Sequence, residues 1–202
     1  MNKVDLPEEI YDVTASGHLG RAVLLRNRFI KINPMQFGLY AALELRNAIE
    51  RLLFEYLVLI HGEKISKNLE KEYRADSLSR RIEAVEPELQ KKIEYMNLML
   101  RAVDMPLAVV PNLDALSNLY GCLNNYLHAW KRPQNTARKR AWWSKLWQVL
   151  DEAERMLTQI LTGTIGHVNL NDKGWQSYEA WKNKELSDEE VITAFRRELQ
   201  KQ

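Results

Sequence analysis

Apolar residues recur along most of this chain at the three- and four-residue spacing of amphipathic helices. The clearest case covers residues 35–61, where apolar side chains occupy most of the circumference, as in a helix at the centre of a fold. Another clear helix covers 114–130, and its apolar stripe consists of Leu116, Leu119, Tyr120, Leu123, Tyr126, Leu127 and Trp130. After residue 33 no stretch alternates as a strand does. The pattern predicts an all-α fold, a single helical bundle.

Prolines, glycines and capping residues divide the rest of the chain. Polar helices are expected at 63–75, after the stop at Gly62, and at 77–85, and Pro87 is placed to open a helix over 87–103. A long helix follows a cap at Asn135 or Thr136 and runs to about 161, and short helices cover 172–184 and 188–200. The last one begins with a capping box of Ser187 and Glu190.

Residues 19–32 satisfy neither the helical nor the strand period, so the structure of 1–33 stays open. We therefore divide the chain into an N-terminal segment at 1–33, the helical bundle at 34–162 and a C-terminal helical extension at 163–202. The length of 202 residues is typical of one domain with an appended piece.

Composition adds a charge asymmetry. The net charge is only +2, but residues 115–150 hold six basic and no acidic side chains, so the remainder sums to −4. Such segregation says more about binding partners than the total does.

The single Cys122 rules out an intramolecular disulfide and fits a reducing cytoplasm. The start of the chain lacks a signal pattern, and no apolar run is long enough to span a membrane. The four His residues show no metal-ligand spacing and no Gly-rich phosphate loop is present, so we expect no cofactor and no metal.

The helix over 114–130 carries a second stripe of small and polar side chains. Its members are Ser117, Gly121, Asn124 and His128, spaced by four, three and four residues and therefore on one side of a helix. An imidazole there can act as a general acid or base, and the Asn124 amide can orient it. Gly121 costs about 1 kcal/mol in a helix relative to Ala, which close contact with a helix or ligand would offset. A solvated face explains the same residues.

Arg46 and Glu50 form a charged pair inside the apolar arc of the 35–61 helix. An ion pair among leucines is costly unless it is matched, and Arg before Glu is the weaker order within a helix. We therefore expect a partner on another helix, with the stripe ending at His128 as one option. The alternatives are a structural buried pair and a pair at the rim of a subunit contact.

Tryptophans alternate with basic residues after residue 129. Aromatic rings that stack on bases and cations that bind phosphate are the chemistry of single-stranded nucleic-acid binding. A helical wheel places Trp142 and Trp143 in the core, with Trp147 at its edge, which leaves Trp147 or Trp130 for exposure. The remaining candidate is a cluster for phosphate, formed by Lys131, Arg132, Arg138, Lys139 and Arg140. Ordinary solvated charges are the alternative.

Two stretches, LELRNAIERLLFEYL at 43–57 and SNLYGCLNNYLHA at 117–129, resemble the HEPN-domain superfamily (higher eukaryote and prokaryote nucleotide-binding proteins). The resemblance implies a compact α-helical bundle, a homodimer and, in many members, metal-independent ribonuclease activity within toxin or antiviral defence systems. The motif of active members is Arg, often Asn next, and a His several residues later. Asn124 and His128 match the second and last positions, and Leu123 stands in place of the Arg.

A leucine cannot stabilise the charge that develops on a phosphate under attack. The preferred interpretation is therefore a HEPN-like binding or regulatory protein, a homodimer whose contact face includes Ser117, Gly121, Asn124, His128 and Glu50. Its basic cluster would bind RNA phosphate or an acidic protein partner. Two alternatives stay open. One is a ribonuclease with His128, Asn124 and Arg46 as catalytic residues, and the other is a helical subunit of a larger complex without nucleic-acid contact.

Overall fold

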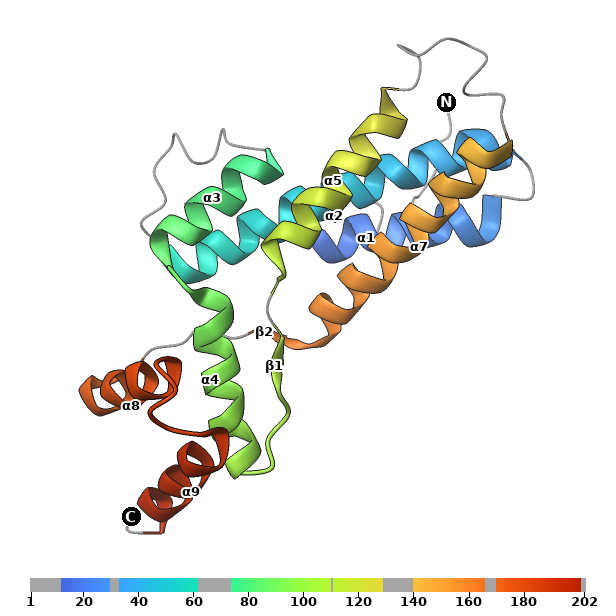
Figure 1. Cartoon of the computed structure of the whole chain (residues 1–202). Coiled ribbons are helices and arrows are strands. Elements are labelled where there is room, and N and C mark those ends of the chain that lie inside the picture. The colour runs from blue at the N-terminus through green and yellow to red at the C-terminus, as the bar shows by residue number, and fades with distance from the viewer. Residues whose placement is uncertain are drawn as a thin grey trace.

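The computed structural model describes residues 12–29, 33–61, 74–109, 111–128, 140–165 and 170–200. The order of elements is α1 (Ala15–Leu24), the π-helical turn η2 (Leu25–Phe29), α2 (Pro34–His61), α3 (Ala75–Val85), α4 (Leu89–Ala102), β1 (Ala108–Val109), α5 (Leu113–Leu127), α7 (Arg140–Thr162), β2 (Thr164–Ile165), α8 (Asp172–Lys182) and α9 (Asp188–Leu199). The predicted all-α class is confirmed (Figure 1).

The bundle is built around α2, which contacts α1, α3, α5 and α7. Its apolar residues face several neighbours at once, and Leu45, Ile49, Leu53 and Leu57 are fully buried. Burying one such side chain contributes about 1.5–3 kcal/mol, so this helix supplies a large share of the apolar free energy of the bundle. The prediction of a central helix at 35–61 agrees with the structure within one residue.

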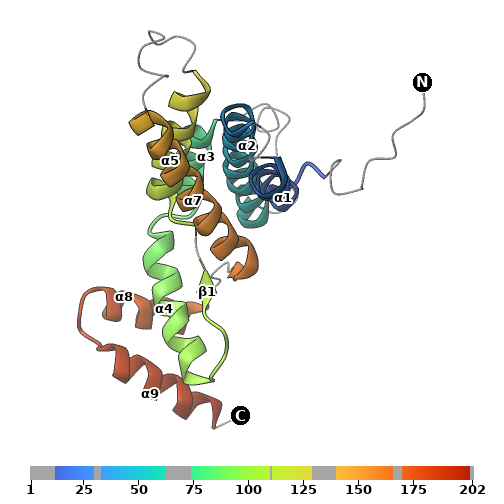
Figure 2. The same ribbon diagram turned by 90° about the vertical axis from the view of Figure 1, so that its right-hand side faces the viewer.

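A second, smaller core lies beyond the end of the bundle. Figures 1 and 2 show α4 leading away from the long helices to α8 and α9, with which it packs. Tyr95, Leu98, Tyr178 and Val191 form this core. It therefore joins a helix from within the predicted 34–162 bundle to the predicted C-terminal extension.

Local differences from the sequence prediction have physical reasons. The segment at 19–32, whose structure the spacing of apolar residues left open, is helical as far as residue 29. Contacts with α2 stabilise this helix. Helix α4 begins at Leu89 rather than Pro87, because Glu88 takes a left-handed backbone with φ of 58° and turns the chain. Strands β1 and β2 pair in parallel over two residues each, too few to show an alternating pattern.

The capping box of α9 is present, since the Ser187 side chain accepts from the Glu190 N–H and the Glu190 side chain accepts from the Ser187 N–H. The expected helix at 63–75 lies outside the described residues except at its end, as do the expected stop at Gly62 and the cap at Asn135 or Thr136.

Gly38 explains how α7 approaches α2 closely. A Cβ atom at this position would lie 2.9 Å from Cη2 of Trp147, so the indole packs on the bare backbone. Trp147 is half-buried by this contact, while Trp142 is buried and Trp143 is half-buried. The tryptophans of α7 are thus mainly packing residues, and Trp130 lies outside the described residues.

Candidate functional site

The partner expected for Arg46 and Glu50 is Tyr120, on α5. Arg46 Nη2 donates to Glu50 Oε1 at 3.0 Å and to the Tyr120 hydroxyl oxygen at 3.1 Å, and that hydroxyl donates to Glu50 Oε1 at 2.8 Å. The guanidinium carbon also lies 5.2 Å from the centre of the tyrosine ring, within cation–π range. Three side chains from two helices therefore form one closed, part-buried cluster between α2 and α5.

The environment of this cluster keeps Arg46 charged and Tyr120 neutral. Burial disfavours the charge on Arg46, but the Tyr120 hydroxyl and the Glu50 carboxylate outweigh burial and raise the pKa of the guanidinium. Burial is also the main cause that raises the pKa of the Tyr120 hydroxyl, which keeps it a neutral donor. The cation of Arg46 is neutralised by Glu50, while its buried Nε has no hydrogen-bond partner among the described residues.

The four residues of the polar stripe on α5 lie in different environments. Ser117 is half-buried, and its hydroxyl is 3.1 Å from that of Ser79 on α3, so it contacts this same chain. Gly121 is exposed, and a Cβ atom there would meet nothing within 4 Å. Asn124 is half-buried, and its carbonyl accepts from the backbone N–H of the exposed His128 at 3.0 Å. Of the four, only Gly121 and His128 are exposed.

Arg46 and His128 lie at different levels of the bundle. Arg46 is bonded to Tyr120, which precedes His128 by eight residues on α5. At 1.5 Å per residue, this separation is about 12 Å along the helix. Among the described residues, no hydrogen bond joins Arg46 to Asn124 or His128.

Leu123, at the position of the arginine in the HEPN motif, is fully buried in the core of the bundle. Its neighbours in sequence, Cys122 and Asn124, are exposed and half-buried. In this alignment with the motif, the first motif position therefore faces the core and not the surface on which His128 lies.

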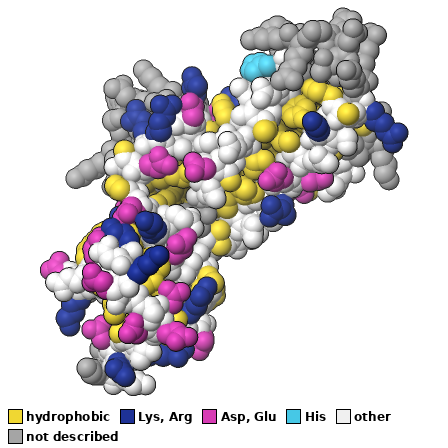
Figure 3. Space-filling view, viewed as in Figure 1, with side chains coloured by type: hydrophobic (Ala, Val, Ile, Leu, Met, Phe, Trp, Pro, Cys, Tyr) yellow, Lys and Arg dark blue, Asp and Glu magenta, His cyan; other side chains and the backbone are white. Residues whose placement is uncertain are grey.

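Most of the predicted phosphate cluster lies outside the described residues, namely Lys131, Arg132, Arg138 and Lys139. Arg140 is described: it is the first residue of α7 and is exposed. Lys145, one turn further on, is exposed as well. Figure 3 shows a broad hydrophobic band along the bundle in this view, whereas acidic and basic side chains mix over the body formed by α4, α8 and α9.

Sequence reasoning missed a second polar cluster, which joins α1 to α2. Nδ1 of His18 lies 2.7 Å from Oε2 of Glu44, and Arg21 Nε donates to the same oxygen at 3.0 Å. These side chains are mostly buried, with 16–21% of their surface exposed. The contact spans 26 residues between two helices, so no spacing within one helix could reveal it. The cluster positions α1 on the central helix.

Sequence reasoning also missed an apolar pocket of about 690 Å³ between α4, α8 and α9. The sequence feature that could have indicated this pocket is the group of three methionines that line it, Met96, Met99 and Met105. In the described part of the chain no three His, Cys, Asp or Glu side chains are grouped as metal ligands.

No helix within the described ranges combines the length and apolar character needed to cross a membrane. Comparison of the chain with known protein families, curated proteins and solved structures found no match.

Proposed function

We propose that this chain is a non-catalytic, HEPN-like helical protein that binds RNA through the phosphates of its backbone. The observation that carries the choice of binding over catalysis is the burial of Leu123. A ribonuclease of the HEPN type needs a cation beside its histidine, and here the motif position that would supply it points into the core.

The state of Arg46 supports the same choice. A guanidinium that stabilises a phosphate in a transition state must be free to point at it. That of Arg46 is neutralised by Glu50 and held by Tyr120, two helical turns from His128. Recruiting it for catalysis would break its two hydrogen bonds and leave the part-buried carboxylate of Glu50 without its cation.

The binding surface is proposed at the basic cluster at 131–140. Five of these ten residues are Lys or Arg, and no acidic residue occurs between 115 and 150. Arg140 adds its charge at the beginning of α7, where the helix dipole places a partial positive charge as well. The side-chain charge and the helix dipole both favour an anion such as phosphate. A basic residue at the N-terminal end of a helix lowers the stability of the helix, so stability does not explain Arg140.

Binding to fluorescent single-stranded RNA over a series of salt concentrations tests the proposal. Five phosphate contacts predict a log–log slope of about −3.5, because each contact to a single strand contributes about −0.7. Replacing the five basic residues by Gln should abolish measurable binding. A control variant replaces five exposed cations of the other body, Lys91, Arg101, Lys173, Lys184 and Arg197, and should bind RNA as the native chain does.

Three results would refute the proposal. Absence of RNA binding at low salt, or equal losses in the two five-residue variants, would leave an acidic protein partner or a larger complex as the function. Cleavage of RNA in EDTA that disappears in His128→Ala would instead establish the ribonuclease alternative. Light scattering of the purified chain tests the proposed homodimer independently.

A further inference from the structure

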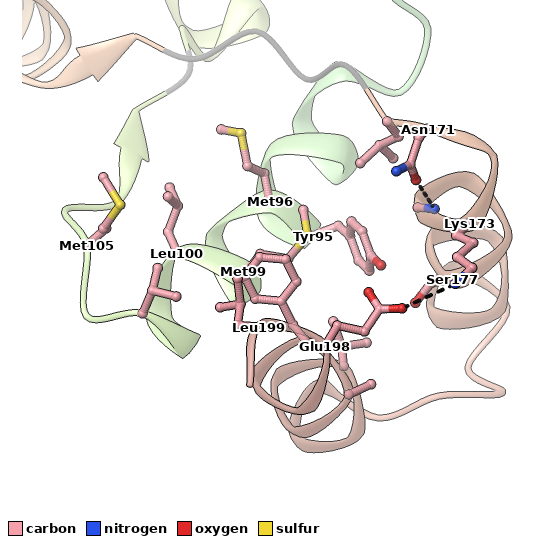
Figure 4. A pocket seen from close by; sticks show the side chains of 16 residues that line it. Tyr95, Met96, Met99, Leu100, Met105, Asn171, Lys173, Ser177, Glu198 and Leu199 are labelled. Atoms are coloured by element: carbon pink, nitrogen blue, oxygen red, sulfur yellow. Dashed lines mark hydrogen bonds and ion pairs between the residues drawn. The ribbon is translucent and has the colours of Figure 1, made fainter. Parts of the chain in front are cut away.

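The pocket between α4, α8 and α9 has the size and lining of a small-molecule site. Its volume of about 690 Å³ lies within the range of about 300–1,000 Å³ that is usual for such sites. Figure 4 shows side chains from all three helices converging on it, so it is a half-enclosed cavity rather than a bare helix face. None of its lining residues belongs to the proposed RNA-binding cluster, and the inference does not depend on that function.

One part of the pocket is apolar and partly open to solvent. Met96, Met99 and Leu100 of α4 line it together with Met105, which is 56% exposed, and Leu199, which is 42% exposed. Exposed apolar surface of this kind is unfavourable in water and is characteristic of binding sites. Methionine side chains are flexible and polarisable, so they adapt to chains and rings of different shape.

Polar groups gather at the side of the pocket formed by α8 and the end of α9 (Figure 4). Lys173 Nζ lies 3.7 Å from Glu198 Oε1, with the two side chains 82% and 61% exposed. The hydroxyl of Ser177 is also on this side, whereas the Asn171 side chain is already used to cap α8 at Gly174. One cation, one anion and one hydroxyl are thus available to a ligand.

This balance of charge decides the chemical class of the ligand. An anionic head group bound at Lys173 would face the carboxylate of Glu198, and a cationic head group bound at Glu198 would face the ammonium of Lys173. An uncharged head group that carries a hydroxyl can accept from Lys173 and donate to Glu198 without either repulsion. We propose that the pocket binds a neutral amphiphile, with its apolar part between α4 and α9 and its uncharged polar head at Lys173 and Glu198.

The experiment measures displacement of a neutral fluorescent probe, N-phenyl-1-naphthylamine, from the full-length chain. Three competitors share a twelve-carbon tail and differ in the head: glycerol monododecanoate, dodecanoate and dodecyltrimethylammonium, each below its micelle concentration. The neutral ester should displace the probe at the lowest concentration. The two ions should each be weaker by about fivefold, the size of one exposed charge interaction.

Charge variants test the head-group assignment. Glu198→Lys should reverse the order in favour of dodecanoate, and Lys173→Glu should reverse it in favour of the trimethylammonium. Both side chains are exposed, and among the described residues their ion pair is with each other, so these changes leave the folded state intact. Equal displacement by the three competitors, unchanged in both variants, would show adsorption without head-group recognition and would overturn the proposal.

Two tryptophan variants on α9 test the location. Ala194 is an exposed residue that lines the pocket, so Ala194→Trp should fill it and weaken probe binding at least tenfold. The adjacent Thr193 is also exposed but does not line this pocket, so Thr193→Trp should bind the probe as the native chain does. Unchanged binding in Ala194→Trp would place the probe elsewhere. Light scattering tests whether two chains associate through this pocket. If they do and the probe is excluded for that reason, the pocket is an interface with a second copy and the proposal is refuted.

Discussion

Replacing Leu123 by Arg would supply the arginine that the resemblance to the HEPN motif lacks, and we expect it to destabilise the bundle rather than create activity. The leucine is fully buried in the core. Loss of its packing costs about 2–5 kcal/mol by analogy with Leu→Ala changes, and a guanidinium without a buried partner adds several more. A total of at least about 5 kcal/mol is a large part of the 5–15 kcal/mol that usually stabilises a domain.

The assay is thermal unfolding followed by circular dichroism, with Cys122→Arg as the matched control. Cys122 is the adjacent residue and is exposed, so the same new side chain should change stability by less than about 0.5 kcal/mol there. For a chain of this length, a loss of 5 kcal/mol lowers the melting temperature by about 10–20 °C. Equal melting temperatures in the two variants would refute the burial argument. Metal-independent RNA cleavage by Leu123→Arg would refute the choice of binding over catalysis.

Three further outcomes are expected from measurements of unfolding by urea. Tyr120→Phe should lower the free energy of unfolding by about 1–2 kcal/mol, because Arg46 and Glu50 each lose a hydrogen-bond partner, and an unchanged value would mean that the cluster is not maintained in solution. Gly121→Ala should raise stability by about 1 kcal/mol, since its Cβ meets open space; a loss of homodimer in this variant would instead establish close contact there. Burial raises the pKa values of Tyr56 and Tyr178 from 10.0 to about 12. The unfolded chain therefore loses these protons first, and stability should fall by about 1.4 kcal/mol per pH unit and ring between pH 10 and 12, a slope that Tyr→Phe variants should reduce.

The helices that could be predicted are those whose information is local. The capping box of α9 needs only Ser187 and Glu190, which are three residues apart, and both hydrogen bonds of the box are present. The spacing of apolar residues likewise located the start of α2 and of α5 within one residue, and the expected end of the second helix at 130 lies three residues beyond Leu127. By contrast, residues 19–29 became helical through contacts with α2, which no window of sequence contains.

The candidate site shows the same division. The sequence predicted that Arg46 and Glu50 need a partner on another helix, but it could not identify Tyr120, whose ring belongs to the apolar stripe and whose hydroxyl completes the polar cluster. Close approach to a glycine was expected at Gly121. Within this chain it occurs at Gly38, because only the three-dimensional packing brings Trp147 there.

The second core also sets the order in which a growing chain can complete its structure. Helix α4 ends at Ala102, but α8 and α9 follow only after α5 and α7, and α9 is complete at Leu199, 97 residues after the end of α4. At about 5–20 residues per second, the ribosome needs about 5 to 20 s to supply them. During that interval Tyr95 and Leu98 cannot pack against Tyr178 and Val191, so the nascent chain presents an apolar helix face to chaperones until α9 emerges.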